Sequence, residues 1–148
     1  MKSTMKIREL QEYLKDRLNK VEALVQGGCK AFAEDTRTVY DESAQFMSGG
    51  GVSVVVVTPK FTRNGSGADG IPCDSRLLIR CMEKPPVAAE NSNALRALDA
   101  AEIVAHALDS NVFLFQDIDQ SVSTDRDGNS VVTATAIFST QLKLTKGE

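Results

Sequence analysis

Residues 73–119 read CDSRLLIRCMEKPPVAAENSNALRALDAAEIVAHALDSNVFLFQDID, and this stretch decides the fold. The apolar run 74–83 predicts a strand that stops at Pro85-Pro86, because proline cannot donate to a sheet ladder. After a polar linker, an Ala/Leu-rich segment predicts a helix over 93–108, and residues 112–119 predict another strand directly behind it. This order indicates a helix packed across a sheet.

The remaining elements follow from hydrophobic period. Helical spacing predicts helices over 5–19 and 37–47, whereas β-branched or alternating runs predict strands over 29–34, 52–58 and 130–144. Together they predict a single α+β domain spanning residues 1–148. Its mixed or antiparallel β-sheet has about four to five strands, packs against two to three helices and ends in a closing β-hairpin.

Both periodicities point apolar residues toward one core between the sheet and the helices. The expected core members are Val54, Val56, Ile79, Leu95, Leu98, Ala105, Leu108, Phe138 and Leu142.

Residues 61–72 are rich in Gly, Ser, Asn and Asp and predict a long loop, which in a compact domain is often mobile or functional. Gly65, Gly67 and Gly70 have the spacing of a dinucleotide-binding fingerprint. That chemistry needs a helix N-terminus next, and here Ile71-Pro72 and a strand follow instead. We therefore expect a flexible loop, with Asn64 and the three glycines as candidates for contact with a partner.

Two further motifs fail on spacing. Residues 125–129 (DRDGN) resemble the middle of a calcium loop, but Ser123 and Ala134 stand where its first ligand and its bidentate Glu belong, so a hairpin turn is expected. Cys29, Cys73 and Cys81 lack the spacing of a zinc site and are expected to be buried thiols.

His106 follows Glu102 by four residues, a spacing more typical of a surface pair than of acid–base catalysis. We expect no catalytic residue, metal or cofactor. The odd cysteine count and the absence of a signal-peptide pattern favour a reducing, cytosolic setting.

Charge is unevenly distributed. Residues 1–20 hold six Lys/Arg against three Asp/Glu, whereas residues 83–129 hold three against nine. This pattern fits two solvated faces, or complementary surfaces on neighbouring subunits. The second reading makes Arg8, Lys15, Glu83 and Glu90 interface candidates.

Glu83 ends a predicted central strand. It is therefore either a solvated strand-end charge or a group that faces a partner or a cleft.

The composition also argues against two classes of partner. The net charge of −3 and the aromatic content of 5% disfavour nucleic-acid binding. No apolar run approaches the ~20 residues of a membrane span.

The order of elements resembles the tail terminator (tail completion) proteins of long-tailed bacteriophages, in particular the minor tail protein U type and the related tail-to-head joining proteins. The shared pattern is an N-terminal helix, a strand and helix, a Val-rich strand ending near Pro59, a variable loop, a strand ending in Glu83-Lys84-Pro85, an Ala-rich helix and a hairpin. The resemblance covers nearly the whole chain.

The resemblance implies a structural protein and not an enzyme. It implies a homo-oligomer, a hexameric ring, that caps the tail tube and joins the tail to the head connector. Its partners would be the tail tube protein and the head–tail connector protein, without a membrane or a specific nucleic acid. It would act at the tail–head junction of the virion, after assembly in the host cytoplasm or as a prophage product. The alternative is a small α+β ligand-binding domain or an enzyme of unknown substrate.

Overall fold

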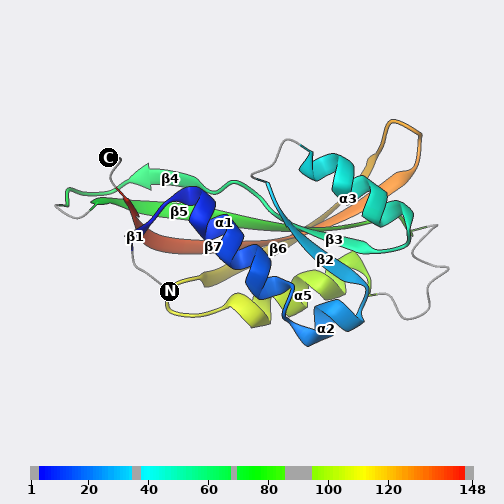
Figure 1. Cartoon of the computed structure of the whole chain (residues 1–148), viewed down its shortest axis with the longest axis horizontal. Helices are drawn as coiled ribbons and strands as arrows, with labels where there is room; N and C mark the ends of the chain where they lie inside the picture. The colour runs from blue at the N-terminus through cyan, green and yellow to red at the C-terminus, as the bar shows by residue number, and fades with distance from the viewer. Residues whose placement is uncertain (1–3, 35–37, 68–69, 86–94, 146–148) are drawn as a thin grey trace.

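The computed structural model describes residues 4–34, 38–67, 70–85 and 95–145. Its framework is one long antiparallel pair, β5 (Gly70–Glu83) and β7 (Ser130–Thr145), which run side by side across the molecule (Figure 1). Their register runs without a break from Gly70 opposite Thr145 to Glu83 opposite Val132.

Each edge of this central pair has two neighbours in succession. Beyond β5 lie β3 (Val52–Val56) at one end and β4 (Lys60–Arg63) at the other. On the other edge, β7 pairs with β6 (Leu114–Thr124) along residues 130–139 and with the two-residue β1 (Thr4–Met5) at residues 143–144. The parallel strand β2 (Cys29–Ala33) pairs with β3 and completes a sheet of seven strands among the described residues. The β1–β7 and β2–β3 pairs are parallel and the others antiparallel, so the sheet is mixed.

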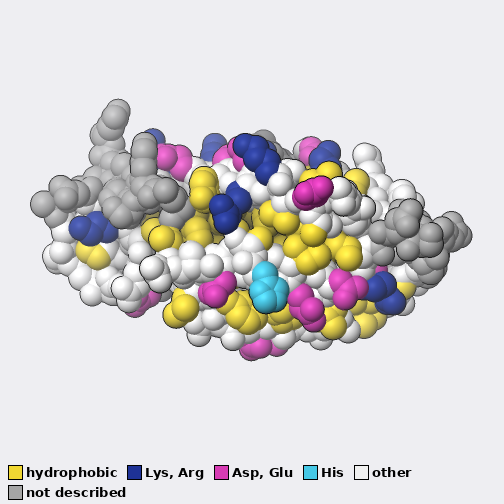
Figure 2. Space-filling model, turned by 90° about the horizontal axis from the view of Figure 1, so that it is seen from below, with side chains coloured by type: hydrophobic (Ala, Val, Ile, Leu, Met, Phe, Trp, Pro, Cys, Tyr) yellow, Lys and Arg dark blue, Asp and Glu magenta, His cyan; other side chains and the backbone are white. Residues whose placement is uncertain are grey.

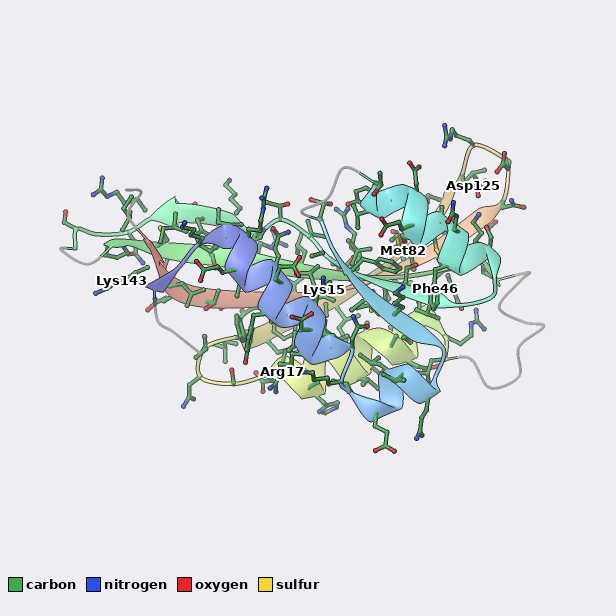
Figure 3. The ribbon with its side chains drawn as sticks, in the orientation of Figure 1. Lys15, Arg17, Phe46, Met82, Asp125 and Lys143 are labelled. Atoms are coloured by element: carbon green, nitrogen blue, oxygen red, sulfur yellow. The ribbon has the colours of Figure 1, made fainter. Side chains whose placement is uncertain are left out.

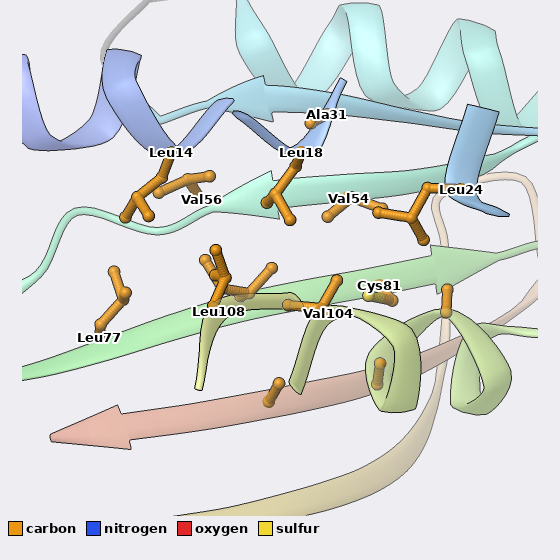
Figure 4. Close-up of a cluster of buried hydrophobic side chains, with 14 of the residues drawn as sticks. Leu14, Leu18, Leu24, Ala31, Val54, Val56, Leu77, Cys81, Val104 and Leu108 are labelled. Atoms are coloured by element: carbon orange, nitrogen blue, oxygen red, sulfur yellow. The ribbon is translucent and has the colours of Figure 1, made fainter. Parts of the chain in front are cut away.

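Helices cover both faces of the sheet. One face carries α1 (Ile7–Leu18), α2 (Glu22–Gln26) and α5 (Ala97–Leu108), whose buried residues form a single cluster with alternate residues of the strands (Figure 4). The other face carries α3 (Val39–Ser48), which connects β2 to β3. The α+β fold with a mixed sheet and a closing hairpin is thus confirmed.

The valine run of β3 is buried on both faces, as expected of a central strand. Val54 and Val56 join the large cluster under α1 and α5, while Val55 joins a smaller one with Phe32 and Val39 under α3. All five residues of β3 are buried, because successive side chains point to opposite faces and each face has a helix above it.

The core expectations hold with one exception. Leu98 is 40% exposed, whereas Leu95 packs against the core and Ala105 and Leu108 are buried. The face of α5 that meets the sheet follows Ala97, Ala101, Val104 and Leu108, a spacing that turns Leu98 outward. Small alanines make up much of the contact face, together with Val104 and Leu108.

The prediction of a long loop over residues 61–72 was wrong. Residues 60–63 form β4, and Gly70 is already the first residue of β5, so the segment is an extended hairpin. The physical reason is pairing with a distant part of the chain: residues 70–73 lie opposite residues 142–145 of β7.

Other boundaries moved by a few residues. The first helix begins at Ile7, the second at Val39, and the strand expected over 112–119 is β6. Residues 93–94 of the expected third helix lie outside the described part.

Candidate functional site

A hollow of about 220 Å³ opens on the surface between α5 and β6. Its apolar floor comes from Phe115 and Ile118 of β6 and from Ala105 of α5. Glu102, His106 and Asp109 form the rim, at helical spacings that place them on one side of α5. Figure 2 shows the histidine on this surface with acidic side chains around it.

The shape of β6 depends on an irregularity near Gln116. Phe115 lies opposite Phe138 and Ile118 lies opposite Ala136, with a register shift between Phe115 and Asp117. Without that extra residue, two positions three apart would face opposite sides of the sheet. The bulge therefore brings both apolar side chains to the side where α5 lies.

Asp109 ties the two elements together. It follows the last residue of α5, and its Oδ1 accepts a hydrogen bond of 3.0 Å from the N–H of Phe115. This bond holds the end of α5 over the beginning of β6.

The charged positions of α1 contact residues of their own chain. Arg17 Nη2 donates a 2.8 Å hydrogen bond to the carbonyl of Ala107 near the end of α5, and Lys15 forms a 2.7 Å ion pair with Glu12 (Figure 3). Arg8 is exposed near the start of α1. Of the two basic interface candidates, Arg8 is exposed and Lys15 is already part of a local pair.

Asn64 joins the two sides of the β4–β5 hairpin. The N–H of Asn64 donates to the carbonyl of Pro72 at 3.0 Å, and its side-chain amide donates to Asp74 Oδ1 at 2.8 Å. A Cβ placed on Gly67 would lie 2.7 Å from the carbonyl oxygen of Gly70. Gly67 thus permits a close approach of two backbone segments, whereas we had expected it to provide flexibility.

Glu83 is buried, with 1% of its surface exposed, so it is neither a solvated charge nor a solvent-facing interface group. Its Oε1 accepts a 2.9 Å hydrogen bond from Arg96 Nε, an ion pair that raises the pKa of the Arg96 guanidinium. Its other oxygen, Oε2, is buried without a hydrogen-bond partner among the described residues. Glu90 lies outside the described residues.

The next residue, Lys84, forms a second pair. Its Nζ lies 3.2 Å from Asp125 Oδ2 in the β6–β7 turn and 3.3 Å from Ser48 Oγ at the end of α3. The carboxylate of Asp125 also accepts the N–H groups of Asp127 and Asn129, at 2.9 Å each. The bond from Asn129 first, and then Lys84 and the Asp127 N–H, hold the pKa of Asp125 below its ordinary value. Residues 125–129 are therefore a hairpin turn.

The thiols are poorly suited to nucleophilic chemistry. All three cysteines are buried and free. Burial raises the pKa of the Cys29 thiol to about 12, and burial together with the neighbouring Cys29 raises the pKa of Cys81 still further. A thiolate is the reactive form, so these two side chains are inert at neutral pH.

Within the described ranges, no group of three or more His, Cys, Asp or Glu side chains is arranged to hold a metal ion. In the same ranges, no helix combines the length and the apolar character that crossing a membrane requires.

Sequence reasoning missed the hollow between α5 and β6. The signal that could have found it is the mixed character of residues 114–122, where apolar and acidic positions intermingle on a strand next to an acidic helix. The bulge that brings Phe115 and Ile118 together leaves no trace in the hydrophobic period.

Comparisons with known proteins give little. No protein-family model and no curated protein matches the chain. A crystal structure from Akkermansia muciniphila overlaps 97% of this chain and 81% of its own, with 9% sequence identity and a TM-score of 0.29. A similarity this weak carries no argument about fold or function.

Proposed function

We propose that this chain is a structural assembly protein of the phage tail-completion kind, which forms a ring on the end of a tail tube and joins it to the head connector. The observation that carries the proposal is the β4–β5 hairpin, which projects at one end of the sheet beyond α1 (Figure 1). A projecting hairpin can reach a neighbouring subunit or a tube beneath the ring.

The order of elements supports the same proposal. From α1 through β2, α3, the valine strand β3, the hairpin and β5 to α5 and the β6–β7 hairpin, it follows the pattern on which the resemblance rests. The exposed charges add a possible mode of contact. Arg8 on α1 and the acidic rim of Glu102 and Asp109 have opposite sign, and such surfaces can join head to tail around a ring.

The burial of Glu83 limits which acidic groups take part. Because its carboxylate is buried and bonded to Arg96, the contact in this proposal uses the exposed Glu102 and Asp109. Arg17 is likewise committed to the carbonyl of Ala107. Arg8 is therefore the most informative basic position to change.

The test measures mass in solution against protein concentration, by sedimentation and by negative-stain microscopy, with and without purified tail tubes. We expect small species at micromolar concentration and sixfold rings at high concentration or on tubes. Arg8→Glu should weaken ring formation at low salt, while the matched reversal Arg126→Glu, at an exposed position in the β6–β7 turn, should not. A chain that stays monomeric at every concentration and on tubes would refute the proposal.

A second variant tests the role of the β4–β5 hairpin in docking to tail tubes. Replacing residues 64–69 by Asn-Gly keeps Gly70, which pairs with Thr145, and leaves a connection of five residues between Arg63 and Cys73, which pair with each other. We expect an unchanged melting temperature and loss of docking to tail tubes. Normal tail completion by a correctly folded shortened variant would remove the hairpin from the proposal.

A further inference from the structure

We infer that the groove between α5 and β6 binds an extended segment of a partner protein, added as a strand to the free edge of β6, with an apolar residue between two basic ones. This inference rests on the edge of β6 and not on the projecting hairpin, although Glu102 and Asp109 on the rim of the hollow also belong to the ring contact proposed above.

The first step is the edge itself. Within the described residues, β6 pairs with β7 alone. Beside the hollow, the N–H of Phe115 donates to Asp109 Oδ1 and the N–H of Ile118 donates to Asp117 Oδ1, so an added strand must displace the Asp117 side chain from the edge. Residues 114–124 contain neither lysine nor proline, and their protection against unspecific pairing is the bulge near Gln116 and the negative charge of Asp117 and Asp119, which a basic segment would neutralise. An extended segment can add to such an edge through main-chain hydrogen bonds.

The second step is the hollow beside that edge. Its volume of about 220 Å³ is below the ~300 Å³ at which small-molecule pockets begin, so it suits one side chain better than a whole ligand. The apolar floor of Phe115, Ile118 and Ala105 would receive an aliphatic side chain. Val122, on the same side of β6 and 65% exposed, extends the apolar strip along the strand.

The third step is the alternation of β6. Ile118 lies opposite the buried Ala136 and points to the side of α5, whereas Asp117 and Asp119 lie opposite Ile137 and Thr135 and point to the other face. A residue added beside Ile118 therefore reaches the hollow, and its two neighbours come next to Asp117 and Asp119. Opposite charges side by side on one face of a sheet are stabilising, so those neighbours are Lys or Arg.

The acidic groups also decide against a second copy of β6. Antiparallel pairing of two β6 edges would bring the carboxylates of Asp117 and Asp119 near those of the other copy, and like charges in cross-strand positions are destabilising. This chain contains one basic–apolar–basic triplet, Lys6-Ile7-Arg8, and its Ile7 is the first residue of α1. The complementary segment therefore belongs to another protein.

The test uses three labelled peptides with the full chain at about 0.15 M salt, where long-range attraction is screened. The probe is acetyl-Ser-Thr-Lys-Leu-Arg-Thr-Ser. The two controls replace its Lys and Arg by Glu, or its Leu by Gly. By fluorescence anisotropy we expect the probe to bind at least about tenfold more tightly than either control, a difference of about 1.4 kcal/mol.

Matched protein variants separate the groove from general charge. Asp119→Lys should weaken binding of the probe about tenfold. Asp41→Lys, an equally large change of charge at an exposed position on α3 and not on β6, should leave binding unchanged. Amide hydrogen exchange should slow along β6 when the probe is bound, because strand addition pairs those N–H groups.

Three results would overturn the inference. Equal affinity for the three peptides would show that neither the charges nor the apolar side chain of the probe is recognised. Equal loss of affinity in the two protein variants would show general charge attraction and no specific site. Probe binding without added protection in β6 would exclude strand addition. Concentration-dependent protection of β6 in the protein alone would show that a second copy occupies the edge.

Discussion

The guanidinium of Arg96 lies 2.9 Å from the carboxylate of Glu83, and the two side chains differ sharply in exposure, at 66% and 1%. The pair joins the last residue of β5 to the residue that precedes α5. It thereby fixes where the helix begins relative to the strand, and the backbone N–H of Arg96 adds a 3.3 Å bond to Asp99 in the first turn of α5.

Removing the cation should therefore destabilise the protein more than loss of an exposed ion pair. Arg96→Met leaves a buried carboxylate without its partner, which we expect to lower the free energy of unfolding. Urea unfolding measures the change. The double variant Glu83→Leu with Arg96→Met should recover much of the loss, since it also removes the buried carboxylate that the single variant leaves unpaired. A single variant as stable as the wild type would contradict this account.

The contact face of α5 gives a matched pair of core variants. Leu108→Ala, at a position 2% exposed, should lower the free energy of unfolding by about 2–5 kcal/mol through the cavity it leaves. Leu98→Ala, at a position 40% exposed, should change it by less than about 0.5 kcal/mol. Chemical denaturation of both variants checks the rotation of the helix, and equal losses would show that it is wrong.

The turn at Asp125 makes stability depend on pH. Folding lowers the pKa of Asp125 from its ordinary value of 3.8, so its contribution is present above that value and is lost as the pH falls through the lower, folded-state pKa. Asp125→Asn cannot ionise and should lose less stability than the wild type between about pH 5 and pH 3. Melting temperatures across this range, measured for both proteins, decide the matter; parallel curves would count against it.

The hairpin tip should tolerate a methyl group at one glycine and not at another. Gly67→Ala brings its Cβ to 2.7 Å from a backbone oxygen, which must shift, and we expect a loss of about 1–3 kcal/mol. Gly65→Ala meets nothing closer than the Pro72 ring at 3.8 Å and should be nearly neutral. Thermal unfolding of the two variants compares them directly, and a neutral Gly67→Ala would show that the tip is loose.

Local signals predicted most of the fold. The Asp-Gly turn at residues 125–129 and the valine run of β3 are determined by residues close in sequence, and both appear where they were expected. The strand 130–144 also turns its expected side inward, with Ala134, Ala136 and Phe138 fully buried.

Two of the failures come from pairing between distant residues. The segment 61–72 is polar and rich in glycine, so nothing in its period shows that residues 142–145 will pair with its second half. The buried Glu83 depends on Arg96, thirteen residues further on. The third failure, Leu98, has another cause: helix-to-sheet packing here uses alanines, whose small size carries little weight in a hydrophobic pattern.

The position of β7 has a consequence for synthesis on the ribosome. It is the last strand of the described chain, yet it lies in the middle of the sheet, between β5 and the pair β6 and β1. Until residues 130–145 emerge, the whole length of β5 from Gly70 to Glu83 has one open edge, and Thr4 and Met5 must wait for Lys143 and Leu144. Such late, long-range pairing is slow and leaves nascent chains exposed to aggregation, so the sheet can close only after residues 130–145 have emerged.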